Sequence, residues 1–327
     1  MNLREQACWL LLVFESGLPT RVVNDILAVW CKQLGRTLQE FFEASSQEWI
    51  ATCHLKAEII QKLEQAKEKR VAQGFLAEQL HNDHIHMITV FDAEYPRLLK
   101  SALKRSQIPS ILFTMGDLSI LERETLAVIG SRNAGETSLA FTKATAQYLA
   151  EHGINVISGN ARGVDRAAYE GATSTDGYTT VVLPHGIRKL SKVQMRDLQP
   201  RIESGHVLLL SQFHPAAPWM VSRAMDRNKV VTGLAQVVIV AESDIKGGTW
   251  EGAKSALEQK RPLYVRQADG SSLPGNEALI QLGGRPLAWS VERFNDILAP
   301  LLQESYVLRQ KQQGMSPPSD QPSLFAS

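Results

Sequence analysis

The sequence predicts an α/β protein in which a small helical domain precedes a doubly wound, Rossmann-like parallel sheet. Short apolar runs alternate with helical segments from residue 126 onward, and the gaps between the runs are long enough for crossover helices. The first part of the chain shows helical spacing alone. A length of 327 residues accommodates one large domain and a smaller companion.

Residues 1–80 are expected to form the helical domain. Apolar residues recur at helical spacing, as at Ile26, Val29 and Trp30, with few glycines to interrupt them. The apolar run 9–14 is too short to span a bilayer, and no signal-peptide cleavage pattern accompanies it. The three cysteines show no metal-ligand spacing. We therefore expect a cytoplasmic protein without membrane contact.

Residues 81–120 are expected to lead from the helical domain into the sheet. Two β-like runs, 87–91 and 111–114, flank a turn at Pro96. His81, His84 and His86 lie close together, but no carboxylate or cysteine pattern completes a ligand set. The sequence therefore predicts no metal, and no motif requires a cofactor.

Residues 121–290 are expected to form the Rossmann-like domain, because near-continuous apolar strands separated by helices are typical of a parallel sheet covered on both faces. Gly153 and Gly171 lie where helix C-termini favour glycine. A final helix is expected over 291–311, and a flexible tail rich in proline and serine over 312–327. The expected strands are 126–129, 155–158, 179–183, 207–210, 237–241 and 263–265.

Four loops beyond the expected strands have the composition of an anion site. Glycine lets the backbone approach a ligand, and a helix N-terminus offers unpaired N–H groups to phosphate. An arginine follows the glycine in two successive loops, which a purely structural turn does not require. Bulk charge is uninformative, since the formal net charge is +1. The candidate phosphate-binding residues are Gly130, Ser131, Arg132, Ser158, Gly159, Arg162, Arg223, Arg227, Asn228, Lys229, Gly247, Gly248 and Thr249.

These loops differ from a dinucleotide-binding fingerprint. No GxGxxG follows the first strand, and no acidic residue ends the second. Hydride transfer with a nicotinamide cofactor is therefore disfavoured. For Asn228, a structural hydrogen bond and a ligand contact are both open.

The same residues resemble the DprA/Smf family of DNA-processing proteins over residues 95–284. The matching segments are 95–99, 128–132, 158–165 and 227–234, followed by Glu242, Gly248 and Thr249. The resemblance implies a non-enzymatic protein that binds single-stranded DNA, protects it and delivers a RecA-type recombinase to it. It also implies a homo-oligomer acting in DNA recombination or in DNA uptake during transformation.

The resemblance assigns roles to particular residues. Arg132 would hold a phosphate bidentately, and Arg227 and Lys229 would extend the positive track. Gly130, Gly159 and Gly248 would let backbone amides approach phosphate oxygens. The family's aromatic residue three positions before its Arg-Asn-Arg segment is replaced by Ala224. Trp219 is a candidate substitute, with a core role as the alternative.

Two other readings use the same loops. In the first, the loops bind a small signalling nucleotide, and the helical domain transmits to other parts of the system whether the nucleotide is bound. In the second, the chain is a LOG-type nucleoside monophosphate phosphoribohydrolase. When Gly248 and Thr249 are aligned with that family's Gly-Thr pair, the catalytic carboxylate position falls on Gly252, and Glu251 lies one residue short. One residue turns a helical side chain by about 100°, so no catalytic residue is expected.

The tail contains a possible docking peptide. Gln321, Leu324 and Phe325 resemble the Gln-x-x-Leu-Phe peptide with which bacterial proteins bind the replication sliding clamp. The alternative is a chance match, since only these positions of the pattern are fixed. The sequence therefore adds the clamp as a candidate partner.

Overall fold

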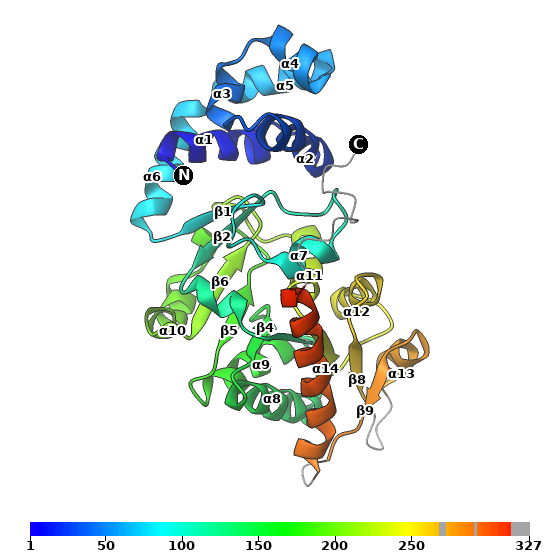
Figure 1. Ribbon diagram of the computed structural model, residues 1–327. Helices are drawn as coiled ribbons and strands as arrows, with labels where there is room; N and C mark the ends of the chain where they lie inside the picture. Colours follow the sequence, from blue (N-terminus) through cyan, green and yellow to red (C-terminus); the bar gives the residue numbers. More distant parts are fainter. Residues whose placement is uncertain (268–272, 291–292, 315–327) are drawn as a thin grey trace. The chain divides into compact units, whose positions relative to one another are not determined.

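The computed structural model describes residues 1–267, 273–290 and 293–314. They form two compact units, coloured along the chain in Figure 1. Among the described residues, the first unit contains Met1–Tyr95 and Leu103–Phe113, and the second contains Pro96–Ala102 and those from Thr114 to Gly314. The candidate clamp peptide at Gln321, Leu324 and Phe325 lies outside the described residues.

The first unit is the helical region that the sequence predicts. Its apolar core includes the stacked rings of Phe41 and Trp49, whose centroids are 5.0 Å apart, and the Trp49 indole N–H donates to the Phe41 carbonyl oxygen. The helices are α1 (Leu3–Leu10), α2 (Thr20–Leu27), α3 (Leu38–Glu43), α4 (Ser46–Cys53), α5 (Ala57–Lys67) and α6 (Arg70–Asn82), with π-helical turns at Leu11–Glu15 and Ala28–Gln33. The strands β1 (His86–Thr89) and β2 (Ile111–Met115) follow, and β2 continues into the second unit.

Asn24 on α2 forms hydrogen bonds to the segment Leu103–Phe113, which packs in the same unit. Its amide donates to the carbonyl oxygens of Arg105 and Ile108, at 2.8 and 3.2 Å, and accepts from the Ser110 hydroxyl at 2.8 Å. All three bonds involve buried or partly buried groups, where an unpaired amide would be costly. Most of the segment between the predicted domains therefore packs with the helical unit.

The second unit contains a parallel sheet with the strand order β6-β5-β4-β3-β7-β8-β9, which confirms the predicted doubly wound fold. The predicted strands agree with the observed ones to within one residue at each end. β9 was not predicted, because Pro286 interrupts its apolar pattern; proline is tolerated there because β9 ends the sheet order. The strands are β3 (Thr125–Ile129), β4 (Asn155–Ser158), β5 (Thr179–Val182), β6 (Val207–Ser211), β7 (Val237–Val240), β8 (Leu263–Arg266) and β9 (Arg285–Leu287).

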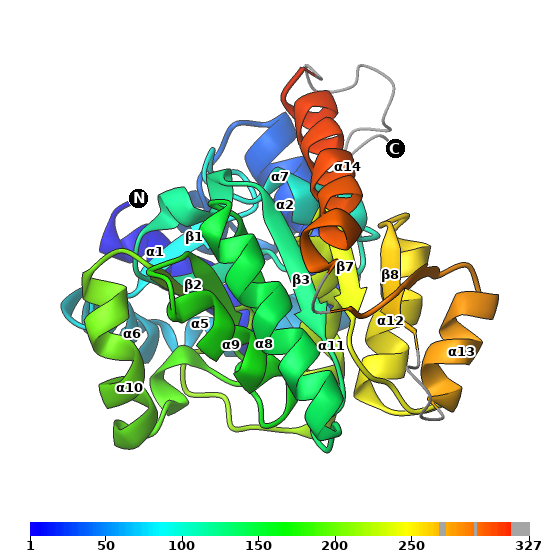
Figure 2. The same cartoon turned by 90° about the horizontal axis from the view of Figure 1, so that it is seen from below.

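Helices cover both faces of this sheet. Leu126 and Val128 of β3 pack with α8, α9 and α14, while α11 and α12 pack together beside the sheet on its other face (Figure 2). The helices are α7 (Arg97–Ala102), α8 (Glu136–Glu151), α9 (Val164–Thr173), α10 (Lys192–Glu203), α11 (Val221–Gly233), α12 (Gly248–Glu258), α13 (Pro274–Gln281) and α14 (Phe294–Gly314), with 3₁₀ turns at Leu118–Glu122 and Ile187–Lys189. None of the helices in the described ranges has the length and apolarity needed to cross a bilayer.

Two glycines singled out in the sequence have different roles. Gly153 follows α8 with φ +73°, as predicted for a helix C-terminus. The same prediction for Gly171 is wrong, because this residue lies inside α9. A Cβ at position 171 would collide with the Lys143 carbonyl oxygen of α8, so glycine allows the two helices to pack closely.

The final helix closes the α8/α9 face. Leu298 and Leu301 of α14 are buried in the same cluster as Phe141 of α8. Within the described residues, α14 begins at Phe294 and ends at Gly314, three residues beyond the expected end at 311. Arg309 near its end donates to the Glu122 carbonyl oxygen, just before β3 begins. That end of α14 therefore lies at the amino-terminal edge of the sheet.

Candidate nucleic-acid interface

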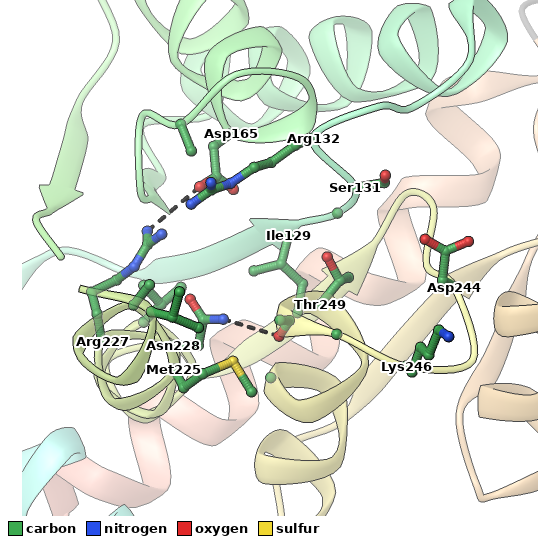
Figure 3. Close-up of a pocket in the computed structure, with 18 of the residues that line it drawn as sticks. Ile129, Ser131, Arg132, Asp165, Met225, Arg227, Asn228, Asp244, Lys246 and Thr249 are labelled. Atoms are coloured by element: carbon green, nitrogen blue, oxygen red, sulfur yellow. Dashed lines mark hydrogen bonds and ion pairs between the residues drawn. The ribbon is translucent and has the colours of Figure 1, made fainter. Parts of the chain in front are cut away.

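A cavity of about 360 Å³ opens at the carboxyl ends of β3 and β7. The strand order reverses at β3. From β3 the chain adds β4, β5 and β6 on one side, and it then returns to add β7, β8 and β9 on the other side of β3. Parallel sheets bind ligands at such a switch point. We call this cavity the β3/β7 cavity; α11 and the loops after β3 and β7 line it (Figure 3).

The loop after β3 carries Arg132 on a braced backbone. The Ser131 N–H donates to the Glu242 carbonyl oxygen at 2.8 Å, and the Ser131 carbonyl accepts from the Val164 N–H at 3.2 Å. Gly163 has φ +84° and lies so close that a Cβ would collide with the carbonyl oxygens of Ser131 and Arg132. The Arg132 side chain is exposed and extends toward Asp165 (Figure 3).

The N-terminus of α8 is already occupied by a carboxylate. Glu242 accepts from the Gly135 N–H at 3.0 Å and from the Ser138 hydroxyl at 2.5 Å. In dinucleotide-binding proteins the first helix of the fold receives the pyrophosphate at this position. The negative charge of the Glu242 carboxylate beside this helix N-terminus disfavours a second anion there.

The N-terminus of α12 has a different character. Gly247 precedes the helix with φ +97°, and no side chain caps the first N–H groups. The Asn228 amide donates to the Gly248 carbonyl oxygen at 2.9 Å and so ties this loop to α11. Gly248 and Thr249 line the cavity, and the helix dipole favours an anion beside them.

Arg227 lies at the inner end of the cavity with its guanidinium buried. Its side chain is 5% exposed, with Nη1 3.3 Å from the Val182 carbonyl oxygen and 3.5 Å from Asp165 Oδ2. Burial lowers the pKa of Arg227 and raises the pKa of Asp165, while the attraction between the two groups opposes both shifts. Arg227 and Asp165 both line the cavity as a buried pair. The guanidinium of Arg227 is less accessible to a ligand than that of Arg132.

The charges around the cavity nearly balance. Arg132, Arg227 and Lys246 are offset by Asp165 and Asp244, so one positive charge is left over among the lining residues. Arg132 and Lys246 are exposed, which places the accessible positive charge at the mouth.

The structure brings together only part of the residue set expected from the sequence. The expected basic residues that do not line the cavity bond to local partners: Arg162 to Asn133, Arg223 to the Pro218 carbonyl oxygen, and Lys229 to Asp226. Ser158 and Gly159 are buried and do not line the cavity. The expected residues that line it are Gly130, Ser131, Arg132, Arg227, Asn228, Gly247, Gly248 and Thr249.

Several residues that line the cavity are not among those expected from the sequence. Asp165 and Asp244 were missed because the argument from phosphate chemistry selects cations, although Asp165 lies within a segment that resembles the family. Lys246, which directly precedes the expected Gly247 and Gly248, also lines the cavity but is not among the residues expected from the sequence. Trp219, whose role was open between the core and the ligand site, lies at the cavity.

The helix after β7 carries no carboxylate into the cavity. Gly252 is the lining residue at the position where a LOG-type enzyme would have its catalytic glutamate. Glu251 is not among the lining residues, and its carboxylate pairs with Lys254 on the same helix at 2.9 Å.

The fold and this site define a Rossmann-like α/β protein with an arginine-bearing glycine loop at the switch point of its sheet. Comparison with known proteins identifies the group within that class. The chain belongs to the DNA recombination-mediator protein A family, whose model matches residues 86–300. The resemblance to DprA/Smf proteins seen in the sequence is thereby confirmed.

Curated relatives support the same assignment. The chain is 28% identical over 228 residues to Protein Smf of Escherichia coli K12, covering 66% of this chain and 60% of that protein. It is 30% identical over 167 residues to DNA processing protein DprA of Streptococcus pneumoniae, covering 51% of this chain and 58% of that protein. The matches therefore span 58–60% of the length of these two relatives.

Two solved structures have a similar fold. DprA from Streptococcus pneumoniae superposes with a TM-score of 0.69 at 21% identity, covering 89% of this chain and 98% of that one. DNA processing protein A from Helicobacter pylori, described for its single-stranded DNA binding mode, gives a TM-score of 0.57 at 25% identity, covering 68% and 98%.

Proposed function

We propose that this protein binds single-stranded DNA in the β3/β7 cavity, with Arg132 as its main phosphate contact. The observation that supports this most is the pairing of an exposed arginine on a braced loop with the uncapped N-terminus of α12 across one cavity. Arg132 would bind two phosphate oxygens, and the N–H groups of Gly248 and Thr249 would bind a neighbouring anion. The structure from Helicobacter pylori, described for its binding of single-stranded DNA, supports the choice of ligand.

The charge of the cavity favours a phosphodiester. An internal phosphate of a DNA strand has one negative charge, which matches the one positive charge left over among the lining residues. A terminal phosphate has about 1.5 to 2 negative charges at neutral pH, and it would also meet Asp165 and Asp244. A phosphodiester is therefore favoured over a nucleoside monophosphate, which weighs against the hydrolase reading and against a monophosphate as the sensed nucleotide.

The protein acts by binding and not by catalysis. Gly252 offers no general acid or base at the position where a phosphoribohydrolase needs a carboxylate. In this proposal the protein protects single-stranded DNA in the cytoplasm and delivers a RecA-type recombinase to it, as a homo-oligomer, during recombination or DNA uptake. The Gln321, Leu324 and Phe325 peptide would add contact with the replication sliding clamp.

A binding titration tests the proposal against the nucleotide-sensing alternative. We expect a fluorescently labelled single-stranded oligonucleotide to bind far more tightly than a deoxynucleoside monophosphate or a dinucleotide, because only a strand supplies several phosphodiesters. Fluorescence anisotropy follows the oligonucleotide directly, and competition reports the small ligands. Equal or tighter binding of the monophosphate or dinucleotide would contradict the proposal.

A further inference from the structure

A run of exposed apolar side chains lies where α11 begins. Trp219, Met220 and Val221 are 48%, 47% and 67% exposed, although large apolar side chains are usually buried. Trp219 and Val221 also line the β3/β7 cavity. An exposed tryptophan beside a site of positive charge needs an explanation other than packing in the core.

The loop that carries Trp219 is held in place by several hydrogen bonds. The Gly186 N–H donates to the Ala217 carbonyl oxygen at 2.9 Å, and the Ala217 N–H donates to the His214 carbonyl oxygen at 2.7 Å. Arg223 Nη1 donates to the Pro218 carbonyl oxygen at 2.5 Å, next to the tryptophan. A Cβ at Gly186 would collide with the carbonyl oxygens of His214 and Pro215, so this close packing requires glycine. The backbone therefore holds Trp219 at the cavity before a ligand binds.

Arg132 connects this tryptophan to the phosphate site. The Arg132 guanidinium carbon lies 5.8 Å from the centroid of the Trp219 ring, within the range of a cation–π contact. A phosphate held by Arg132 would bring the attached nucleotide next to the indole. Ala224, in the first turn of α11, also lines the cavity and offers no ring of its own.

From this geometry we infer that Trp219 stacks on a base of the bound strand, an inference that rests on the proposed binding of single-stranded DNA. Every base has a π face, so stacking on an indole adds affinity without strong preference for sequence. In this arrangement Arg132 and the N-terminus of α12 bind phosphates, and Trp219 stacks on a base. The stacking ring thus comes from the residues that precede α11, whereas Ala224 inside α11 has no ring.

Oligonucleotides with and without bases test this arrangement. We compare a single-stranded oligonucleotide with a strand of the same length and charge whose nucleotides are abasic. Wild-type protein should bind the strand with bases more tightly, and Trp219→Ala should weaken that binding about fivefold to a hundredfold, the range for one base–aromatic stack. Binding of the abasic strand should be the same in both proteins.

Two further variants guard against an effect on folding. Trp219→Phe retains a ring and should retain most of the affinity, while it loses the quenching of tryptophan fluorescence that stacking on a base produces in the wild type. Tyr306→Ala removes another half-exposed aromatic ring, on α14 near Arg309 and the amino-terminal edge of the sheet, and should change neither affinity.

The possible failures are distinguishable. If wild type and Trp219→Ala bind both strands alike, stacking is wrong while binding through phosphates stands. If Trp219→Ala weakens both strands equally, the residue supports the fold of the site and does not stack. If the wild type binds neither strand, the proposed function fails together with this inference.

Discussion

The guanidinium of Arg227 occupies the space that any side chain at position 159 would need. A Cβ on Gly159 would overlap it, and the guanidinium is held there by Asp165 and by the Val182 carbonyl oxygen. Because both charges are buried, each depends on the other for compensation. At the scale of single residues, Arg227 therefore has mainly a structural role at the cavity, because its charge is buried and paired.

Replacing Gly159 by Ala tests this arrangement. The methyl group should displace the Arg227 guanidinium from Asp165 and lower the free energy of unfolding by about 1–3 kcal/mol, the penalty for buried polar groups that lose their partners. Urea unfolding followed by circular dichroism measures the change. In an Arg227→Met background the same glycine substitution should cost clearly less, because the colliding group is gone.

Gly74→Ala provides the matched control. Gly74 lies in α6, and a Cβ there would meet no atom within 4 Å, so this change should leave stability equal or slightly raised. An unchanged unfolding free energy in Gly159→Ala, or an equal loss with and without Arg227, would refute the assigned role of the pair.

At the scale of secondary-structure elements, local pattern was sufficient for the strands and insufficient for the site. Buried parallel strands are short, largely apolar runs between turn residues, and each of β3 to β8 contains at least two consecutive apolar residues. β9 lacks such a run because Pro286 lies at its centre. Gly171 shows what local pattern misses at a single position. Glycine is needed there because α8 packs closely against α9, and a tertiary contact of this kind cannot be seen in the neighbouring sequence.

The candidate site shows the same limit. The glycines and Arg132 could be selected from the sequence because a loop after a strand is a local feature. Whether a nearby cation faces the cavity depends on tertiary packing: Arg227 is buried against Asp165, and Lys229 pairs with Asp226. Likewise, Glu242 reaches the N-terminus of α8 from a position 107 residues beyond Gly135.

At the scale of the whole molecule, DNA binding and contact with the sliding clamp are proposed for different parts of the chain. Replacing Leu324 and Phe325 by Ala should abolish capture of purified clamp in a pull-down, because the apolar pair supplies most of the buried surface in such a peptide. The same double variant should bind single-stranded DNA as the wild type does, since these residues are far in sequence from those lining the cavity. Equal clamp capture by both proteins, or none by either, would remove the clamp from the list of partners.

The most direct test of binding at the β3/β7 cavity is the salt dependence of DNA affinity in Arg132→Ala. Loss of one phosphate contact should weaken binding of a single-stranded oligonucleotide by about 1.5–3 kcal/mol. It should also make the slope of log affinity against log salt shallower by about 0.7. Arg201→Ala, which removes the same charge beside Asp176, away from the lining residues, should have a much smaller effect on both quantities. A folded Arg132→Ala protein with the affinity and the salt slope of the wild type would contradict the assignment of this cavity as the DNA-binding site.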